Sequence, residues 1–240
     1  MLSAIAEWIA LHPATPPRTL LLGVTPALAQ LQLPPGSSLT GVDHSAIMTK
    51  AVWPRNIPDQ RSVLRGSWLA LPMRDMSCDL VLGDGSMNCI PYSDFRALAA
   101  EVRRVLRSDG LFILRCYTRP VVAEDPAVVI AELPGHSSFD HFRLRLLMAL
   151  QSSVERGTAV HDAYRYWSKW NFDKASLATQ TGWSRESIDM IELYRGPNTA
   201  HTFPTQAEFQ SALGEFFHHI KILIPSYSMG ESCPTLVHRP

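Results

Sequence analysis

The chain has 240 residues, of which 46% are hydrophobic and 18% are charged. This length and composition suit one large domain with a buried core and are atypical of a disordered protein. Lysine plus arginine balance aspartate plus glutamate at 22 each, so no overall charge attracts nucleic acid or an anionic membrane, and neither is predicted as a partner.

The N-terminal segment, the cysteines and the hydropathy together indicate a cytoplasmic protein. Residues 1–13, MLSAIAEWIALHP, lack a basic start and carry Glu7, so they are predicted to form a helix rather than a signal peptide. The four cysteines form no Cys-x-x-Cys pair, which favours buried, reduced thiols and predicts no metal site. No run of about 18 apolar residues is present to span a membrane.

Five apolar segments of strand length follow in chain order. They cover residues 19–22, LTGVD ending at Asp43, SVLRG ending at Gly66, residues 80–82, and residues 110–117. Near-continuous apolar strands are typical of a parallel sheet that is covered on both faces. Between the last two segments, a helix is predicted from a cap at Ser93 or Asp94 to a stop at Gly110. The rhythm of strand and helix predicts a doubly wound α/β domain.

The strand–helix alternation stops after residue 117 and returns only near residue 220. Residues 119–200 show helical patterns and no convincing strand, so they are predicted to form a helical insertion that caps the substrate side. A helix with a capping box from Thr205 to Glu208 follows. HIKILIPSY and CPTLVHRP then read as two strands joined by a short polar turn, an antiparallel hairpin at one sheet edge. Residues 1–118 and 201–240 would form the ligand-binding domain.

The turn after the first strand is a candidate ligand site, because open parallel sheets bind ligands beyond the carboxyl ends of their strands. Gly23 has no Cβ and lets a ligand approach the backbone, with Val24 and Thr25 next in the turn. A helix starting near Pro26 would direct its N-terminal dipole at the same place. The alternative is that Gly23 only forms an ordinary turn.

The ends of the second and third strands supply further candidates. Asp43, with His44 beside it, lies about 20 residues after the glycine turn, where an acid can accept both ribose hydroxyls. Trp68 or Leu69 could flank an adenine ring. Two structural alternatives stay open: Asp43 could cap a helix that begins at Ser45, and Trp68 could belong to the core.

Three stretches carry a resemblance to a known family. LRGSWLALPMRDMSCDLVLGDGSMNCI, EVRRVLRSDGLFIL and GVDHS resemble the class I S-adenosylmethionine-dependent methyltransferases, over residues 15–118 and more weakly at the closing hairpin. The resemblance implies a mostly parallel, seven-stranded, Rossmann-like sheet with a C-terminal antiparallel hairpin. It also implies an enzyme, a methyltransferase that uses S-adenosyl-L-methionine as its methyl donor.

The resemblance also implies roles for single residues. Gly23 corresponds to the loop glycine and Asp43 to the ribose-binding acid, while Asp84 lies where the fourth strand faces the methyl-transfer site. The full set expected to contact the cofactor is Gly23, Val24, Thr25, Asp43, His44, Ser67, Trp68, Leu69, Asp84 and Gly85.

The loop departs from the family pattern at several positions. Leu21 replaces an acid, Thr25 and Ala27 replace the second and third glycines, and Ser67 replaces an acid that meets the adenine. Pro26 also removes one backbone N–H. Either Gly23 and the Thr25 hydroxyl preserve the binding geometry, or the pocket has lost the cofactor.

Methyl transfer depends mainly on positioning and desolvation, and a base is needed only where the nucleophile must lose a proton. Candidate bases are Asp84, His141 and His136, and for each histidine a surface or capping role is the alternative.

The acceptor is expected to be a small molecule chosen by Arg143, Tyr164 and Trp167 of the insertion. Alternatively, the aromatic side chains form the core of the insertion or a homodimer contact. Two other functions stay open. One is a non-catalytic binding or partner protein with an eroded cofactor loop. The other is a dinucleotide-dependent oxidoreductase, which the absence of Gly-x-Gly-x-x-Gly disfavours.

Overall fold

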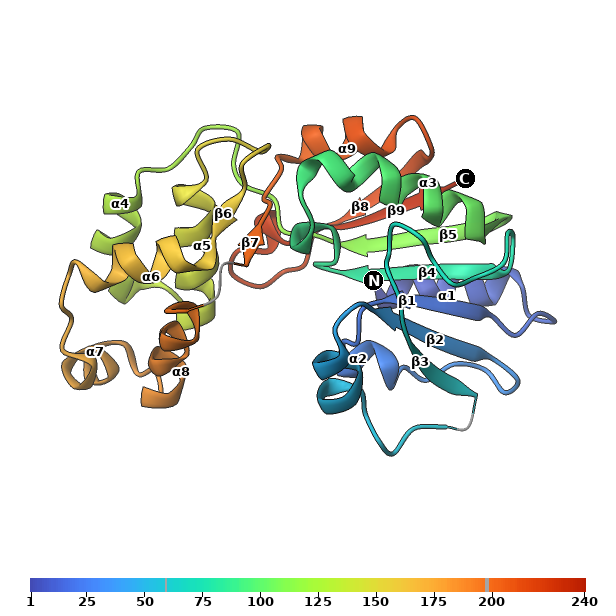
Figure 1. The fold of residues 1–240 in the computed structure, drawn as a ribbon, viewed down its shortest axis with the longest axis horizontal. Coiled ribbons are helices and arrows are strands. Elements are labelled where there is room, and N and C mark those ends of the chain that lie inside the picture. The colour runs from blue at the N-terminus through green and yellow to red at the C-terminus, as the bar shows by residue number, and fades with distance from the viewer. Residues whose placement is uncertain (59, 197–198) are drawn as a thin grey trace.

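The computed structural model describes residues 1–58, 60–196 and 199–240. Its main feature is a seven-stranded sheet in the order β3-β2-β1-β4-β5-β9-β8 (Figure 1). Strands β1 to β5 run parallel, and β9 pairs antiparallel with both β5 and β8. The doubly wound sheet and the C-terminal antiparallel pair are therefore confirmed. The strands are β1 (Arg18–Leu22), β2 (Ser38–Asp43), β3 (Arg61–Arg65), β4 (Cys78–Asp84), β5 (Leu106–Arg115), β8 (His218–Leu223) and β9 (Thr235–Arg239).

Helices cover both faces of the sheet, as the continuous apolar strands predict. On one face Leu20 and Leu22 of β1 join a core with α3 (Phe95–Val105) and α9 (Gln206–Leu213). On the other, Leu21 packs with α1 (Leu2–Leu11) and the single turn of α2 (Pro26–Ala29). Successive side chains of a strand point to opposite faces, so one strand serves both cores.

Helices α4 to α8 gather at one end of the sheet (Figure 1) and share a separate apolar core. They are α4 (Pro126–Ala131), α5 (Phe139–Leu150), α6 (Val160–Ser168), α7 (Lys174–Thr181) and α8 (Arg185–Asp189). The segment is helical as predicted, but it also contains a two-stranded pair, β6 (Thr158–Ala159) with β7 (Ala200–His201). Two-residue strands are too short to give an alternating pattern, so the sequence did not reveal them.

The largest differences from the predicted boundaries are at the start of β5 and between β8 and β9. The helix expected to stop at Gly110 ends at Val105, because β5 begins at Leu106, which pairs with Cys78 before a register shift. The connection between β8 and β9 is not a short turn; it spans residues 224–234 and includes a 3₁₀ turn at Gly230–Ser232. The capping box is present, with Thr205 and Glu208 bonded reciprocally.

All four cysteines are free thiols. Cys78, Cys116 and Cys233 are buried as predicted, whereas Cys89 is exposed, so the prediction is wrong for that residue. Within the described ranges, no helix has the length and apolar character needed to cross a membrane.

Candidate functional site

Gly23 follows β1 and adopts a backbone conformation that favours glycine. Its φ is +110°, and its N–H donates to the Val42 carbonyl at 2.8 Å. A Cβ built on Gly23 would lie 3.7 Å from Cζ2 of Trp68, which is ordinary van der Waals contact. The requirement for glycine in this structure therefore comes from the backbone angle, and the nearest atom above it belongs to Trp68.

Trp68 lies over the glycine turn. Its indole N–H donates to the Val42 carbonyl at 2.6 Å, the same oxygen that accepts from Gly23. The half-buried ring also packs against the core on the α3 face of the sheet. The ring thus lies beside the turn, and its packing agrees with the alternative that Trp68 belongs to the core. A ligand held against Gly23 would require this ring to move.

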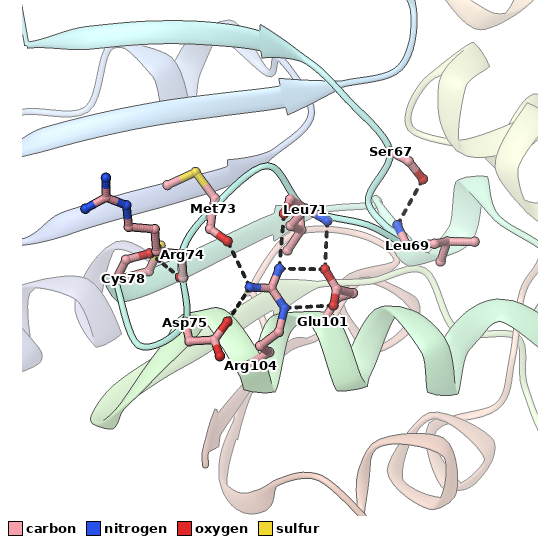
Figure 2. Close-up of polar contacts among 10 residues, drawn as sticks. Ser67, Leu69, Leu71, Met73, Arg74, Asp75, Cys78, Glu101 and Arg104 are labelled. Carbon is pink, nitrogen blue, oxygen red and sulfur yellow. Dashed lines mark hydrogen bonds and ion pairs between the residues drawn. The ribbon is translucent and has the colours of Figure 1, made fainter.

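The segment that carries Trp68 is fixed to α3 by a polar cluster (Figure 2). The Arg104 guanidinium donates to the carbonyls of Leu71 at 3.1 Å and Met73 at 2.8 Å. It also pairs with Asp75 at 2.7 Å and with Glu101 at 2.8 Å. Glu101 in turn accepts from the Leu71 N–H at 2.7 Å. The hydrogen bond from Arg104 holds the pKa of Glu101 below its usual value, because the guanidinium favours the charged carboxylate.

Replacing Arg104 with methionine should lower the free energy of unfolding by about 2 kcal/mol, since two carbonyls and Glu101 lose their donor. Urea unfolding measures the change, and Arg103→Met, at the adjacent exposed position, is the matched control. The Glu101 contribution should be present above its unfolded pKa of about 4.5 and fade as pH falls through the lowered folded pKa. Equal stability of both variants would contradict the role of the cluster.

Asp43 is a buried residue at the end of β2, and its side chain is 11% exposed. Oδ1 accepts from the Ser45 N–H at 2.8 Å, so the capping alternative is realised locally. Within the described residues, no hydrogen bond engages Oδ2. That oxygen is available to accept from a ligand hydroxyl while Oδ1 holds the turn.

The other predicted cofactor residues surround this turn unequally. Val24 is buried, and Thr25 starts the one-turn helix α2 without a side-chain capping bond. The His44 side chain is 84% exposed. Ser67 Oγ accepts from the N–H of the exposed Leu69 at 3.1 Å. The described residues of this turn offer few backbone N–H groups to a ligand, because α2 has a single turn and Pro26 has no N–H.

A cavity of about 450 Å³ lies beyond the carboxyl ends of β4 and β5, against α5 and β7. Asp84, Gly85 and His141 line it, so the structure brings these three predicted residues together. Gly23 and Asp43 are not among its lining residues. The predicted site therefore consists of two parts, the glycine turn with its neighbours and this cavity. Further lining residues are Asn88, Cys89, Arg115, Tyr117, Asp140, Arg143, Tyr194, His201, Phe203, Tyr227 and Cys233.

The cavity floor contains an ion pair between Asp84 and Arg115. The guanidinium donates from Nε to Oδ1 and, at 2.8 Å, from Nη2 to Oδ2. Both oxygens of the carboxylate proposed as a catalytic group are thus engaged. Burial acts to lower the pKa of Arg115, but its hydrogen bonds and charge interaction with Asp84 outweigh burial and raise it.

Of the other insertion residues singled out in the sequence, only Arg143 lines the cavity. Trp167 is 5% exposed and packs in the helical core, as in the alternative interpretation. The Tyr164 hydroxyl accepts from Arg195 at 2.8 Å. His136 packs on Phe142 away from the cavity, and burial lowers its pKa.

Asn88 and His201 are site residues that the sequence interpretation missed. The Asn88 amide donates to the carbonyls of Tyr117 at 2.8 Å and Thr202 at 2.7 Å, and its side-chain oxygen accepts from the Tyr117 N–H at 2.9 Å. The Asn88 carbonyl accepts from the Thr202 N–H at 2.9 Å. Asn88 thereby joins the segment after β4 to the end of β5 and to β7, which places His201 at the cavity.

Comparison with known proteins relates the chain to one family model and to several solved structures of the same fold. Residues 21–114 match the model of a family described as a methyltransferase domain. No curated protein matches the sequence significantly. A Methanosarcina mazei structure described as a SAM-dependent methyltransferase aligns with TM-score 0.53 and 13% identity over 96% of each chain.

Two further structures share the fold. The 1,6-didemethyltoxoflavin-N1-methyltransferase of Burkholderia thailandensis, solved with 1,6-didemethyltoxoflavin and S-adenosylhomocysteine, aligns with TM-score 0.52 and 13% identity, over 98% of this chain and 75% of that one. A Rhodobacter sphaeroides structure described as a Zn-dependent alcohol dehydrogenase aligns with TM-score 0.58 and 13% identity, over 98% of this chain and 89% of that one. At this identity, each likeness shows the fold alone.

Proposed function

We propose that the chain is a class I S-adenosylmethionine-dependent methyltransferase and that it transfers a methyl group from S-adenosylmethionine to a small acceptor in the cavity. The match to a methyltransferase-domain model and the strand order of the sheet support this proposal. The observation that carries the proposal is the place of the 450 Å³ cavity at the carboxyl ends of β4 and β5, where ligands of such sheets bind. In this proposal residues 1–118 and 201–240 hold the cofactor, and residues 119–200 close the acceptor side and exclude water.

Gly23, Asp43 and Trp68 fit the adenosine part of the cofactor in their chemistry. Asp43 would accept from a ribose hydroxyl through Oδ2, and Gly23 would allow the sugar to approach the backbone. The Trp68 ring must first leave its place over Gly23, which breaks one hydrogen bond worth about 1 kcal/mol. When bound, S-adenosylmethionine supplies an activated methyl group. The chain then has only to position the acceptor and manage its proton.

A second candidate is a binding protein of the same fold without activity. The observation that favours it is the indole of Trp68 over Gly23, together with the single turn of α2. In that case the cavity would bind a small molecule or partner segment without a methyl donor.

Titration calorimetry with S-adenosylmethionine distinguishes the two functions. Asp43→Asn keeps an oxygen for the Ser45 N–H but loses the charge, so we expect it to fold normally and to bind S-adenosylmethionine about tenfold to a hundredfold more weakly. Asp125→Asn is the matched control, since Asp125 also accepts from a backbone N–H, that of Ala127 at 2.8 Å. Undetectable binding by the unmodified protein at millimolar cofactor would favour the second candidate.

A further inference from the structure

His201 lies at the cavity in a fixed orientation. It is on β7, which pairs with Thr158 of β6, and the neighbouring Thr202 bonds to Asn88 through both its N–H and its carbonyl. The His201 ring accordingly lies next to the C-terminal end of the insertion and lines the same cavity as Asp84 of β4 and Arg115 of β5.

The contacts of the ring determine its tautomer. Nδ1 lies 3.3 Å from the Asn88 carbonyl oxygen. A carbonyl can only accept, so Nδ1 carries the proton, and Nε2 of the neutral ring keeps its lone pair. Burial lowers the pKa of His201 and the hydrogen bond to Asn88 offsets part of that effect, so the ring is neutral near pH 7. No hydrogen bond among the described residues engages Nε2, which leaves this acceptor to the cavity.

The charged groups that share the cavity are already paired. Asp84 uses both oxygens on Arg115. Arg143 pairs with Asp140, and its guanidinium lies 5.2 Å from the centre of the Tyr194 ring.

The tyrosine hydroxyls and cysteine thiols that line the cavity are protonated near pH 7. Burial raises the pKa of Tyr117 to about 12 and also raises the pKa of Tyr194 and Tyr227. Burial likewise raises the pKa of the Cys233 thiol. Cys89 is exposed as a residue, but desolvation by the protein atoms around its thiol, and then the carboxylates of Asp43 and Asp84, raise the pKa of that thiol.

His141 is the one other histidine at the cavity. Its Nδ1 contacts the Ser137 hydroxyl, which can donate or accept and therefore does not determine the tautomer. His201 is thus the group whose free lone pair is defined by its contacts.

We propose that His201 is the general base of the transfer and that the acceptor is a phenol-like hydroxyl on a small aromatic ring. The proposal rests on the proposed function. Tyr117, Tyr194 and Phe203 give the cavity aromatic walls suited to such a ring. A base is needed because an un-ionised phenol is a poor nucleophile, and its pKa resembles that of tyrosine, about 10.

The step balances without a further reactant. The acceptor O–H proton moves to Nε2 of His201, and the oxygen forms the new bond to the methyl carbon. The bond between that carbon and sulfur breaks with its electron pair remaining on sulfur, which turns the sulfonium into a neutral thioether. The imidazolium then returns its proton to water after the product leaves.

The tautomer can be measured without any substrate. Long-range ¹H–¹⁵N NMR of the labelled full chain, with His201→Asn to assign the signals, should show His201 protonated on Nδ1 and neutral at pH 7. Its pKa should lie below 6.5, the reference value. A ring protonated on Nε2, or charged at pH 7, would overturn the proposal.

Methyl transfer to two probes tests the proton transfer itself. The probes are phenol and 4-nitrophenol in a mildly alkaline buffer, where the second is already an anion. His201→Asn retains a donor for the Asn88 carbonyl but removes the base. Transfer to phenol should fall about a hundredfold to ten-thousandfold, while transfer to 4-nitrophenolate should change little. His161→Asn is the matched control, because His161 Nδ1 also contacts a backbone carbonyl, that of Arg195 at 2.7 Å, outside the cavity.

Each remaining outcome has a distinct meaning. Equal losses with both probes would make His201 a structural residue, and an unchanged rate with phenol would also overturn its role as base. Binding of S-adenosylmethionine without transfer to either probe would overturn the base and the phenolic acceptor but leave a methyltransferase of another substrate class. Failure to bind S-adenosylmethionine would instead refute the proposed function itself.

Discussion

Replacing Gly23 by alanine should weaken binding of S-adenosylmethionine at least about a hundredfold, which corresponds to about 3 kcal/mol. At φ +110° an L-residue is strained, so the backbone of the turn must rotate or carry a cost of about 1–3 kcal/mol. Rotation would draw the Gly23 N–H away from the Val42 carbonyl. An unrotated turn would instead point a methyl group at the space that the cofactor must share after Trp68 moves. Both responses act against a ligand at this turn.

A matched glycine separates strain from binding. Gly182 ends α7 at φ +72°, and a Cβ there would meet nothing within 4 Å. Gly182→Ala should therefore lower the unfolding free energy by a similar order without affecting calorimetric binding. If Gly23→Ala binds S-adenosylmethionine as the unmodified chain does, the cofactor does not approach this loop.

The central strands of the sheet could be predicted from the sequence because they are short apolar runs separated by polar segments. Leu20, Leu21 and Leu22 are all buried since both faces of β1 are covered, and continuous burial is what such a run predicts. The start of β5 was not readable. Arg107, Ser108 and Asp109 are polar, and they extend a strand only because Leu106 pairs with Cys78 across the register shift.

The glycine turn could be predicted from the sequence, whereas the contacts within the cavity could not. Gly23 directly follows β1 and Asp43 is the last residue of β2, so strand position alone predicted where they lie. The contact between His201 and the Asn88 carbonyl joins residues 113 positions apart. Such a pair has no sequence periodicity, and His201 lies on a two-residue strand that the sequence did not reveal. The place of Trp167 could not be decided from the sequence, because an aromatic residue at helical spacing is compatible both with a core and with a pocket. In the structure Trp167 lies in the core.

His238 is buried as an uncharged imidazole, so we expect the fold to lose stability in acid. This residue of β9 is 1% exposed, and neither ring nitrogen has a hydrogen-bond partner among the described residues. Phe112, Phe217 and His219 surround it. Burial, and then the nearby His219, lower the pKa of His238 from 6.5 to about 4.

Because the folded pKa lies below the unfolded one, the unfolded chain binds the proton first as the solution is acidified. Stability should be fully present above about pH 6.5 and fall as pH decreases towards about 4, by about 3 kcal/mol in total from this residue. His136 and His201 act in the same direction, since burial lowers the pKa of both.

His238→Leu should remove most of the loss of stability between about pH 6.5 and 4. It should also stabilise the fold at neutral pH by about 1 kcal/mol, because it removes two unpaired polar atoms from an apolar site. Urea unfolding at a series of pH values measures both effects. His218→Gln, at an exposed position on the adjacent strand β8, should keep the pH dependence of the unmodified chain. If His238→Leu lost stability in parallel with the unmodified chain across the whole window, His238 would not be the group that titrates. The loss of stability in acid would then have to come from His136, His201 or the carboxylates. The carboxylates lose their charge at lower pH, because their unfolded pKa values lie near about 4.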